Sequence, residues 1–215
     1  KILYLTTFKK QLTMTSPNLI HMRTAREKLK NNWSTAFLVG LTVMIPQTIS
    51  EILKAIGSIE AGGMEDISLG LISTLVAAPL ALGFSIYTLN LFRNGSADYN
   101  NIFDGFKSLG KILGVYFLMI ALIILGMILL IIPGIILAFG FSMAYYVMID
   151  KPELGIVDTL KESWKIMKGN KTKLLGLSLR FIPWAILGIL CLVLGVIFVL
   201  PWMQMSYASF YEEIK

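Results

Sequence analysis

The chain has 215 residues, of which 56% are hydrophobic and only 15% are charged, and its formal net charge is +6. Because soluble domains carry about a quarter charged residues, this composition excludes an ordinary soluble protein and indicates a membrane protein. The single cysteine, Cys191, and the single histidine, His21, exclude an intramolecular disulfide framework and the paired imidazoles of zinc and di-iron sites.

The N-terminal segment, residues 1–21, differs from the rest of the chain because it is rich in Thr and has no long apolar run. Its apolar stretch at residues 2–5 is too short for the core of a signal peptide. We expect a poorly ordered extension over residues 1–21, with a genuine cytoplasmic tail as the alternative. His21 is expected to be a solvated residue at the membrane interface. Residues 22–215 are expected to form a single integral-membrane domain.

From residue 22 onward, a unit occurs three times, over about residues 22–92, 98–150 and 152–212. Each unit begins with a basic amphipathic stretch and continues with an apolar run of ~40 residues that is broken near its middle. Such a run is roughly 60 Å long as a helix, enough for two crossings of a ~30 Å hydrocarbon core. The sequence therefore predicts an all-α, polytopic membrane helical bundle of about six transmembrane helices, arranged as three repeated hairpins.

The predicted spans are residues 34–56, 67–92, 109–131, 134–149, 173–192 and 196–211. In the second hairpin, Pro133 ends one helix and Gly134 permits a tight reversal, so the turn is expected at residues 132–134. Some spans are shorter than ~20 apolar residues. Five spans, or a re-entrant hairpin, therefore remain the alternative.

The second and third units align without a gap, and the aligned pairs include Lys111 and Lys173, Gly126 and Gly188, and Tyr145 and Tyr207. In the first unit, the Gly-Phe-Ser of residues 83–85 repeats that of residues 140–142. Arg180 aligns with Leu118. We therefore expect that the repeat contains no repeated polar site.

The connecting segments are amphipathic. Over residues 152–168 the apolar side chains recur at helical spacing opposite charged ones, and residues 98–107 and 19–30 form shorter versions. We expect these helices to lie in the headgroup plane with their apolar faces toward the acyl chains. The candidate surface for anionic headgroups, or for a membrane-protein partner or a second copy of the chain, consists of Lys161, Trp164, Lys165 and Lys168.

Basic residues precede the first hairpin and follow the first and second, whereas the connections on the opposite side are acidic or uncharged. The positive-inside rule therefore predicts cytoplasmic N and C termini. Juxtamembrane lysines are attracted to anionic headgroups, so the basic balance does not indicate nucleic-acid binding.

No residue is predicted to be catalytic, to hold a cofactor or to ligate a metal. The sequence contains no nucleophile elbow, no H-E-x-x-H, no P-loop and no cysteine pair with metal spacing. Arg180 is the exceptional residue, because a charge among apolar neighbours costs a few kcal/mol unless it is paired or hydrated. It is the candidate for an intramembrane anion site, opposed by Asp104 or Asp150; snorkelling toward the headgroups is the alternative.

Several short motifs carry a resemblance to a known family: Ile132-Pro133-Gly134-Ile135, Met167-Lys168-Gly169 and Leu200-Pro201, with Phe210 and Tyr211. Over residues 22–215 the chain resembles an uncharacterised bacterial integral-membrane family, the domain of unknown function numbered 975. The resemblance implies a multi-pass protein of the bacterial cytoplasmic membrane and supplies no activity.

The leading functional hypothesis is a non-enzymatic accessory factor that binds lipid or a partner through its cytoplasmic amphipathic helices. The alternative is a small-solute or peptide transporter, or an exporter component, with a cavity near Arg180. Internal repeats are common in transporters, but these hairpins share one orientation.

Overall fold

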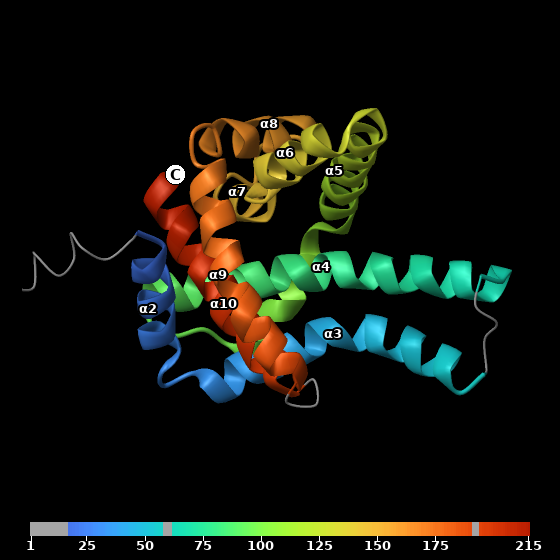
Figure 1. Ribbon diagram of the computed structural model, residues 1–215, viewed down its shortest axis with the longest axis horizontal. Coiled ribbons are helices and arrows are strands. Elements are labelled where there is room, and N and C mark those ends of the chain that lie inside the picture. The colour runs from blue at the N-terminus through green and yellow to red at the C-terminus, as the bar shows by residue number, and fades with distance from the viewer. Residues whose placement is uncertain (1–16, 58–61, 191–193) are drawn as a thin grey trace, which may run out of the picture.

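The computed structural model describes residues 17–57, 62–190 and 194–215. Over these residues the chain is helical and contains no β-strand (Figure 1). The elements are α2 (Pro17–Leu29), α3 (Trp33–Ala55), α4 (Met64–Asn94), the 3-10 helix η1 (Tyr99–Ser108), α5 (Leu109–Leu129), α6 (Ile131–Phe141), α7 (Ala144–Asp150), α8 (Ile156–Ile166), α9 (Lys171–Leu190) and α10 (Leu194–Ile214). The predicted all-α class is confirmed.

Within the described residues, five helical segments are long and apolar enough to cross a membrane. They are Trp33–Ala55, Met64–Asn94, Tyr99–Leu129, Ile131–Asp150 and Lys171–Ile189. The membrane character predicted from composition therefore has a structural basis, whereas the number of six spans stays a prediction.

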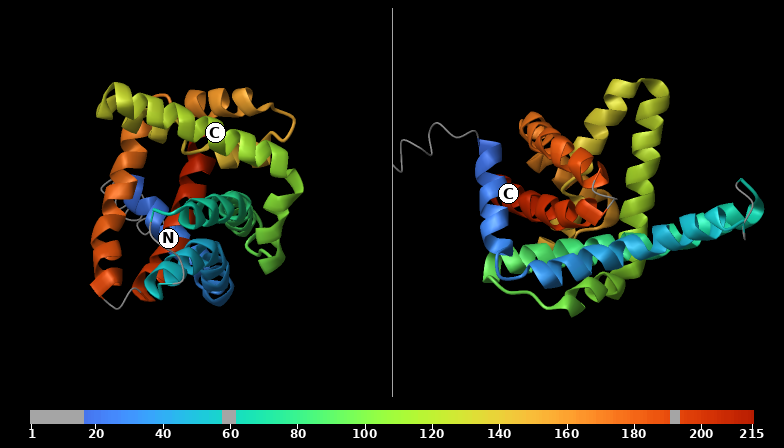
Figure 2. Two further views of the ribbon diagram at one scale, coloured as in Figure 1. Left: turned by 90° about the vertical axis from the view of Figure 1, so that its right-hand side faces the viewer. Right: turned by 60° about the horizontal axis from the view of Figure 1, so that its bottom comes forward.

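Three antiparallel hairpins, α3–α4, α5–α6 and α9–α10, extend from a common core in different directions (Figures 1 and 2). The core contains the ends of the hairpins far from their tips. In α4, for example, Tyr87 and Leu91 are fully buried, whereas Leu71 and Ile72, near the tip, are 55% and 57% exposed. The hairpins therefore pack together at one end, and their apolar tips require hydrocarbon or another apolar partner around them.

The reversal of the second hairpin lies two residues before the predicted position. Helix α5 ends at Leu129, Leu130 has an extended backbone (φ −164°, ψ 143°), and α6 begins at Ile131. Pro133 therefore lies in the first turn of α6, where a missing N–H removes no intrahelical hydrogen bond. The predicted span 134–149 lies within the apolar segment Ile131–Asp150, which is divided between α6 and α7.

In the second and third hairpins, glycines lie where the two helices approach each other closely. A Cβ on Gly126 would lie 3.1 Å from the backbone nitrogen of Gly134, and one on Gly195 would lie 2.6 Å from Cα of Gly188. Gly126 and Gly188 are the pair that the sequence alignment makes equivalent. Small residues thus allow the helix backbones to approach closely at corresponding places.

The amphipathic connections bury part of their apolar faces in protein, whereas Val157 of α8 and Phe103 of η1 are 52% and 48% exposed, so contact of these faces with acyl chains stays a prediction. Helix α8 buries Leu160, and Ser163 on the same face donates a hydrogen bond to the carbonyl of Gly140 at 3.0 Å. Ile102 of η1 is fully buried, and a Cβ on Gly83 of α4 would overlap its backbone. Glycines on the long helices make room for these connections, so part of each apolar face packs on protein.

Helix α2 begins at Pro17, so residues 17–21 of the predicted extension belong to the helical fold. The rest of the predicted extension, residues 1–16, lies outside the described residues. The prediction of a solvated His21 is wrong, because its residue is only 4% exposed. Its Nδ1 lies 3.0 Å from Oγ of Ser209, and its Nε2 lies 3.2 Å from the carboxylate of Glu213. Burial against α10 lowers the pKa of His21 below its ordinary value, although Glu213 opposes this shift.

Candidate functional site

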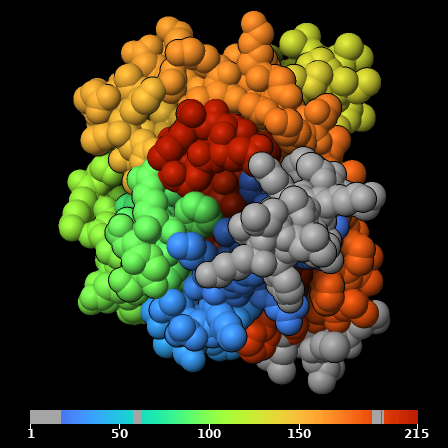
Figure 3. All heavy atoms as spheres, turned by 90° about the vertical axis from the view of Figure 1, so that its left-hand side faces the viewer, coloured from blue at the N-terminus to red at the C-terminus, as the bar shows by residue number. Residues whose placement is uncertain are grey.

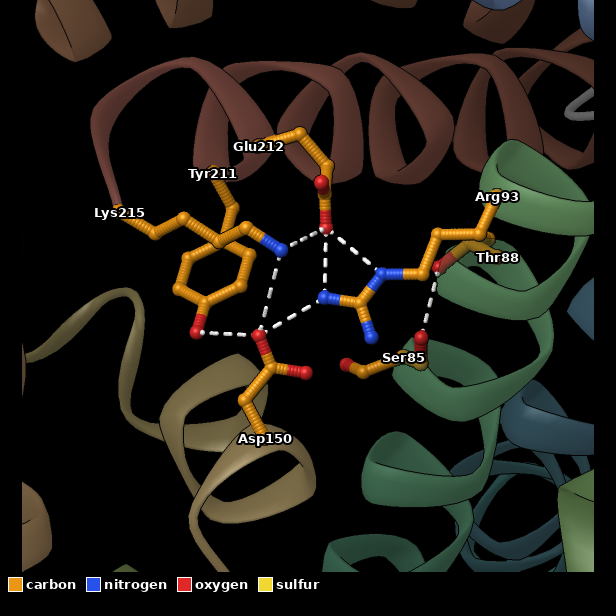
Figure 4. A network of polar contacts seen from close by, with 7 residues as sticks. All are labelled: Ser85, Thr88, Arg93, Asp150, Tyr211, Glu212 and Lys215. Carbon is orange, nitrogen blue, oxygen red and sulfur yellow. Dashed lines mark hydrogen bonds and ion pairs between the residues drawn. The ribbon is translucent and has the colours of Figure 1, made fainter.

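The ends of three helices are joined by a polar network, which Figure 4 shows from close by. Arg93, at the end of α4, lies between Asp150 of α7 and Glu212 of α10. Its Nη2 is 2.7 Å from Oδ2 of Asp150, and its Nε donates a hydrogen bond to Oε1 of Glu212 at 2.7 Å. The three side chains are between 19% and 32% exposed, so these charge-assisted bonds are partly shielded from water.

Tyr211 of α10 and Lys215, which follows α10, complete the network. The hydroxyl of Tyr211 donates to Oδ2 of Asp150 at 3.1 Å. Nζ of Lys215 lies 2.9 Å from Oε1 of Glu212 and 3.6 Å from Oδ2 of Asp150. Two cations and two carboxylates therefore balance one another. Within the described ranges, no group of His, Cys, Asp and Glu is arranged to hold a metal ion.

The network contains one residue from each predicted repeat unit, at the same position of each. Arg93 and Asp150 are separated by 57 residues, which is also the separation of Ser85 and Ser142. The gapless alignment of the second and third units places Asp150 on Glu212. In the predicted register, Arg93, Asp150 and Glu212 are therefore equivalent residues; we call them the triad.

A cavity of about 330 Å³ lies between α3, α4, the α6–α7 segment and α10. It is lined by Gly40, Val43, Ala81, Phe84, Ser85, Ser142, Tyr145, Tyr146, Leu200, Met203, Gln204 and Tyr207. We call it the central cavity. None of these lining side chains is charged, and most of the lining is apolar or aromatic.

The polar residues of the central cavity also occupy equivalent positions. Ser85, Ser142 and Gln204 correspond in the three units, and Ser85 and Gln204 are 119 residues apart, as Arg93 and Glu212 are. Tyr145 and Tyr207 correspond in the second and third units. In the predicted register, polar residues at one position of each unit thus line the same cavity, although no repeated polar site was expected. The Gly-Phe-Ser repeat and the aligned tyrosines were the sequence signals for this arrangement.

Hydrogen bonds cross the central cavity between units. Nε2 of Gln204 donates to Oγ of Ser85 at 3.0 Å, and Ser85 donates to the carbonyl of Ala81 at 3.1 Å. The hydroxyl of Tyr146 donates to the backbone carbonyl of Gln204 at 3.2 Å. The ring of Tyr146 also stacks on Tyr211, with centroids 5.2 Å apart. This stack connects the cavity lining to the triad.

The hydroxyl of Tyr207 retains an acceptor for another molecule. Oγ of Ser178 donates to the carbonyl of Leu174 at 2.9 Å, and it also lies 2.9 Å from the hydroxyl of Tyr207. Because Ser178 has a single hydroxyl proton, Tyr207 must be the donor in the second bond. The lone pairs of Tyr207 are therefore not used by that bond.

The structure does not bring together the predicted anion site. Arg180, on α9, is half-buried, does not line the central cavity and makes no ion pair with another described residue. Asp104 pairs with Lys107 at 2.6 Å, and Asp150 belongs to the triad. Anion binding at Arg180 stays a prediction, without the two carboxylates that were expected to oppose it.

The predicted lysine surface divides into exposed and docked residues. Lys161 and Lys165 have side chains 73% and 78% exposed, and Lys168 is also exposed. Trp164 is half-buried, with its ring 5.8 Å from that of Phe141, so it belongs to the packed face. We call Lys161, Lys165 and Lys168 the lysine edge of α8.

The lysine edge also carries acidic neighbours. Lys161 lies 3.4 Å from Asp158, and Lys165 lies 3.7 Å from Glu162. Lys151 forms the shorter contact with Glu162, at 2.7 Å, and this hydrogen bond holds the pKa of Glu162 below its ordinary value. The lysine pairs are long and exposed, so they contribute little stability.

One family model, described as a protein of unknown function (DUF975), matches residues 115–215. Over these residues the chain is similar to that family. The DUF975 segment includes Asp150, Glu212 and the cavity residues of the second and third units. Residues 22–114, over which the resemblance was also expected, lie outside the match. No curated protein and no solved structure matches the chain.

Proposed function

We propose that the chain is a six-span protein of the bacterial cytoplasmic membrane, with both termini in the cytoplasm. The sixth span is α10, which pairs with α9 as the returning helix of the third hairpin. Helix α2, the end of α10 and the neighbouring segments of α8 and α9 share one face (Figure 3), away from the tip of α3–α4. The basic residues of α2 and α8 favour the cytoplasm for this face.

We further propose that the protein is a non-enzymatic accessory factor that binds anionic lipid headgroups. The observation that carries this proposal is the lysine edge, exposed on a helix whose opposite face is fixed to the hairpins. Each lysine near an anionic membrane surface contributes about 1 kcal/mol of attraction. A transporter with its cavity at Arg180 has less support, because Arg180 does not line the central cavity.

The test compares lipid binding by two variants that each lose three positive charges. The first changes Lys161, Lys165 and Lys168 to Ser; the control changes the exposed residues Arg23, Lys30 and Lys107 to Ser. Phosphatidylglycerol retained by each purified protein is measured by native mass spectrometry, with phosphatidylcholine as the neutral comparison.

We expect the first variant to retain at least tenfold less phosphatidylglycerol than the wild type. Each lost lysine removes about 1 kcal/mol of attraction, and a tenfold change in affinity corresponds to about 1.4 kcal/mol. The control variant should retain most of it. Equal losses in both variants would show an effect of net charge alone and would contradict the role of α8. Loss of a copurifying protein instead of lipid would indicate that the lysine edge docks a partner.

A further inference from the structure

We propose that the central cavity binds a small, uncharged molecule that has an apolar body and at least one hydrogen-bonding group. This site is separate from the lysine edge and does not depend on lipid binding there. Its volume of about 330 Å³ is at the lower end of the range of ligand pockets, about 300–1,000 Å³. The ligand is therefore small, and all three repeat units surround it.

Hydrogen-bonding groups that the protein leaves unpaired line this cavity. Among the described residues, the hydroxyl of Tyr145 and the Oε1 of Gln204 have no protein hydrogen-bond partner, and Tyr207 keeps an acceptor. In a membrane protein, a polar group without a partner costs free energy comparable to a lost hydrogen bond, because little water competes for it. A ligand that satisfies these groups from inside the cavity recovers that cost.

The absence of charged side chains from the lining favours an uncharged ligand. No lining residue of the central cavity is charged, and the guanidinium of Arg93 is already bound by Asp150 and Glu212. An ion in the cavity would lose its hydration without meeting an opposite charge, which is strongly unfavourable in an apolar environment. The apolar side chains Val43, Phe84 and Leu200 accept an apolar body instead.

The arrangement around the cavity also argues for a built site rather than a packing defect. Equivalent residues of the three units come together in two places. The lining contains Ser85, Ser142 and Gln204, and the triad lies on the other side of the Tyr146–Tyr211 stack. In a simple packing defect, larger apolar side chains could occupy the space at little cost in stability. Here each unit places a polar residue at the lining instead.

The experiment uses 5-fluoroindole, a neutral bicyclic probe with one N–H donor, and follows its ¹⁹F NMR signal during titration with the full chain in detergent micelles. We expect saturable binding to the wild type. Ala81→Phe, which places a ring in the cavity, should abolish binding. Tyr145→Phe and Gln204→Met keep the shape of the lining and should each weaken binding threefold to tenfold. Tyr99→Phe, on η1 and outside the lining, is the matched control and should bind as the wild type does.

The proposal is overturned if the wild type shows no saturable binding or if Ala81→Phe binds as tightly as the wild type. A charged probe of similar shape, 5-fluoroindole-3-acetate, should bind at least tenfold more weakly, and equal affinity would refute the assignment of an uncharged ligand. Replacement of the lysine edge by Ser should leave 5-fluoroindole binding unchanged, so failure of the lipid proposal can be told apart from failure of this one.

Discussion

Arg93 is bound by two carboxylates from different helices, and its replacement tests how strongly the triad fixes the helix ends. In Arg93→Gln the two carboxylates would face each other without the guanidinium that separates them. Because the side chains are only partly exposed, we expect a loss of about 1–3 kcal/mol in the free energy of unfolding. Thermal unfolding in detergent, followed by circular dichroism, measures this change.

Lys107→Gln is the matched control for Arg93. Its ion pair with Asp104 is short, but the lysine side chain is 79% exposed, so its loss should cost less than about 1 kcal/mol. A double variant, Arg93→Gln with Asp150→Asn, should be more stable than the sum of the two single losses predicts, because it removes both partners. Strictly additive losses would contradict a direct coupling between these residues.

The same residue explains why the predicted anion site differed from the observed polar network. Sequence reasoning selected Arg180 because it interrupts an apolar run, whereas Arg93 lies at a helix end, where a basic residue is ordinary. Tertiary packing determines which helix ends come together, and a local sequence pattern does not predict that packing. Arg93, Asp150 and Glu212 are equivalent in the predicted register, but residues of opposite charge do not align as similar residues.

At the level of elements, the contact between α4 and η1 depends on Gly83. A Cβ at this position would overlap the backbone of Ile102, which cannot move aside as a flexible side chain can. We expect Gly83→Ala to displace η1 and to destabilise the protein by about 1–3 kcal/mol, despite the higher helix propensity of Ala. Thermal unfolding and limited proteolysis at η1 measure the effect.

Gly110→Ala provides the control, because Gly110 is also helical and a Cβ there would meet no atom within 4 Å. Its helix propensity gain should make it neutral or stabilising by up to about 1 kcal/mol. If both alanine variants behave alike, the close packing of η1 on α4 is not what holds this element.

The long apolar helices could be predicted from the sequence because hydrophobic runs of this length almost always form membrane-spanning or buried helices. The positions of the helix breaks and the packing partners of the amphipathic faces could not be predicted. Pro133 is compatible with either side of a reversal, and the close approach of Gly134 to α5 decides between them. The apolar faces of α8 and η1 are equally suited to lipid and to protein, and the glycines opposite them determine the outcome.

At the scale of the whole molecule, burial and charge are distributed in a consistent way. The buried core, the triad and the central cavity lie where the hairpins converge, and the exposed apolar residues lie toward their tips. A soluble protein could not keep such tips in water, since large contiguous apolar patches drive association. The tips are thus the parts of the molecule expected to contact hydrocarbon or another apolar partner.

The proposed orientation can be tested with single cysteines introduced into a Cys191→Ser background. Met64, at the tip of the first hairpin, is 82% exposed, and Lys168 follows α8 on the basic face. A membrane-impermeant maleimide added to intact cells should label Met64→Cys, whereas Lys168→Cys should react only after the membrane is opened, because lysine-rich connections stay in the cytoplasm. The reverse pattern would place the lysine edge outside the cell, away from the anionic inner leaflet, and would remove the basis for lipid binding through α8.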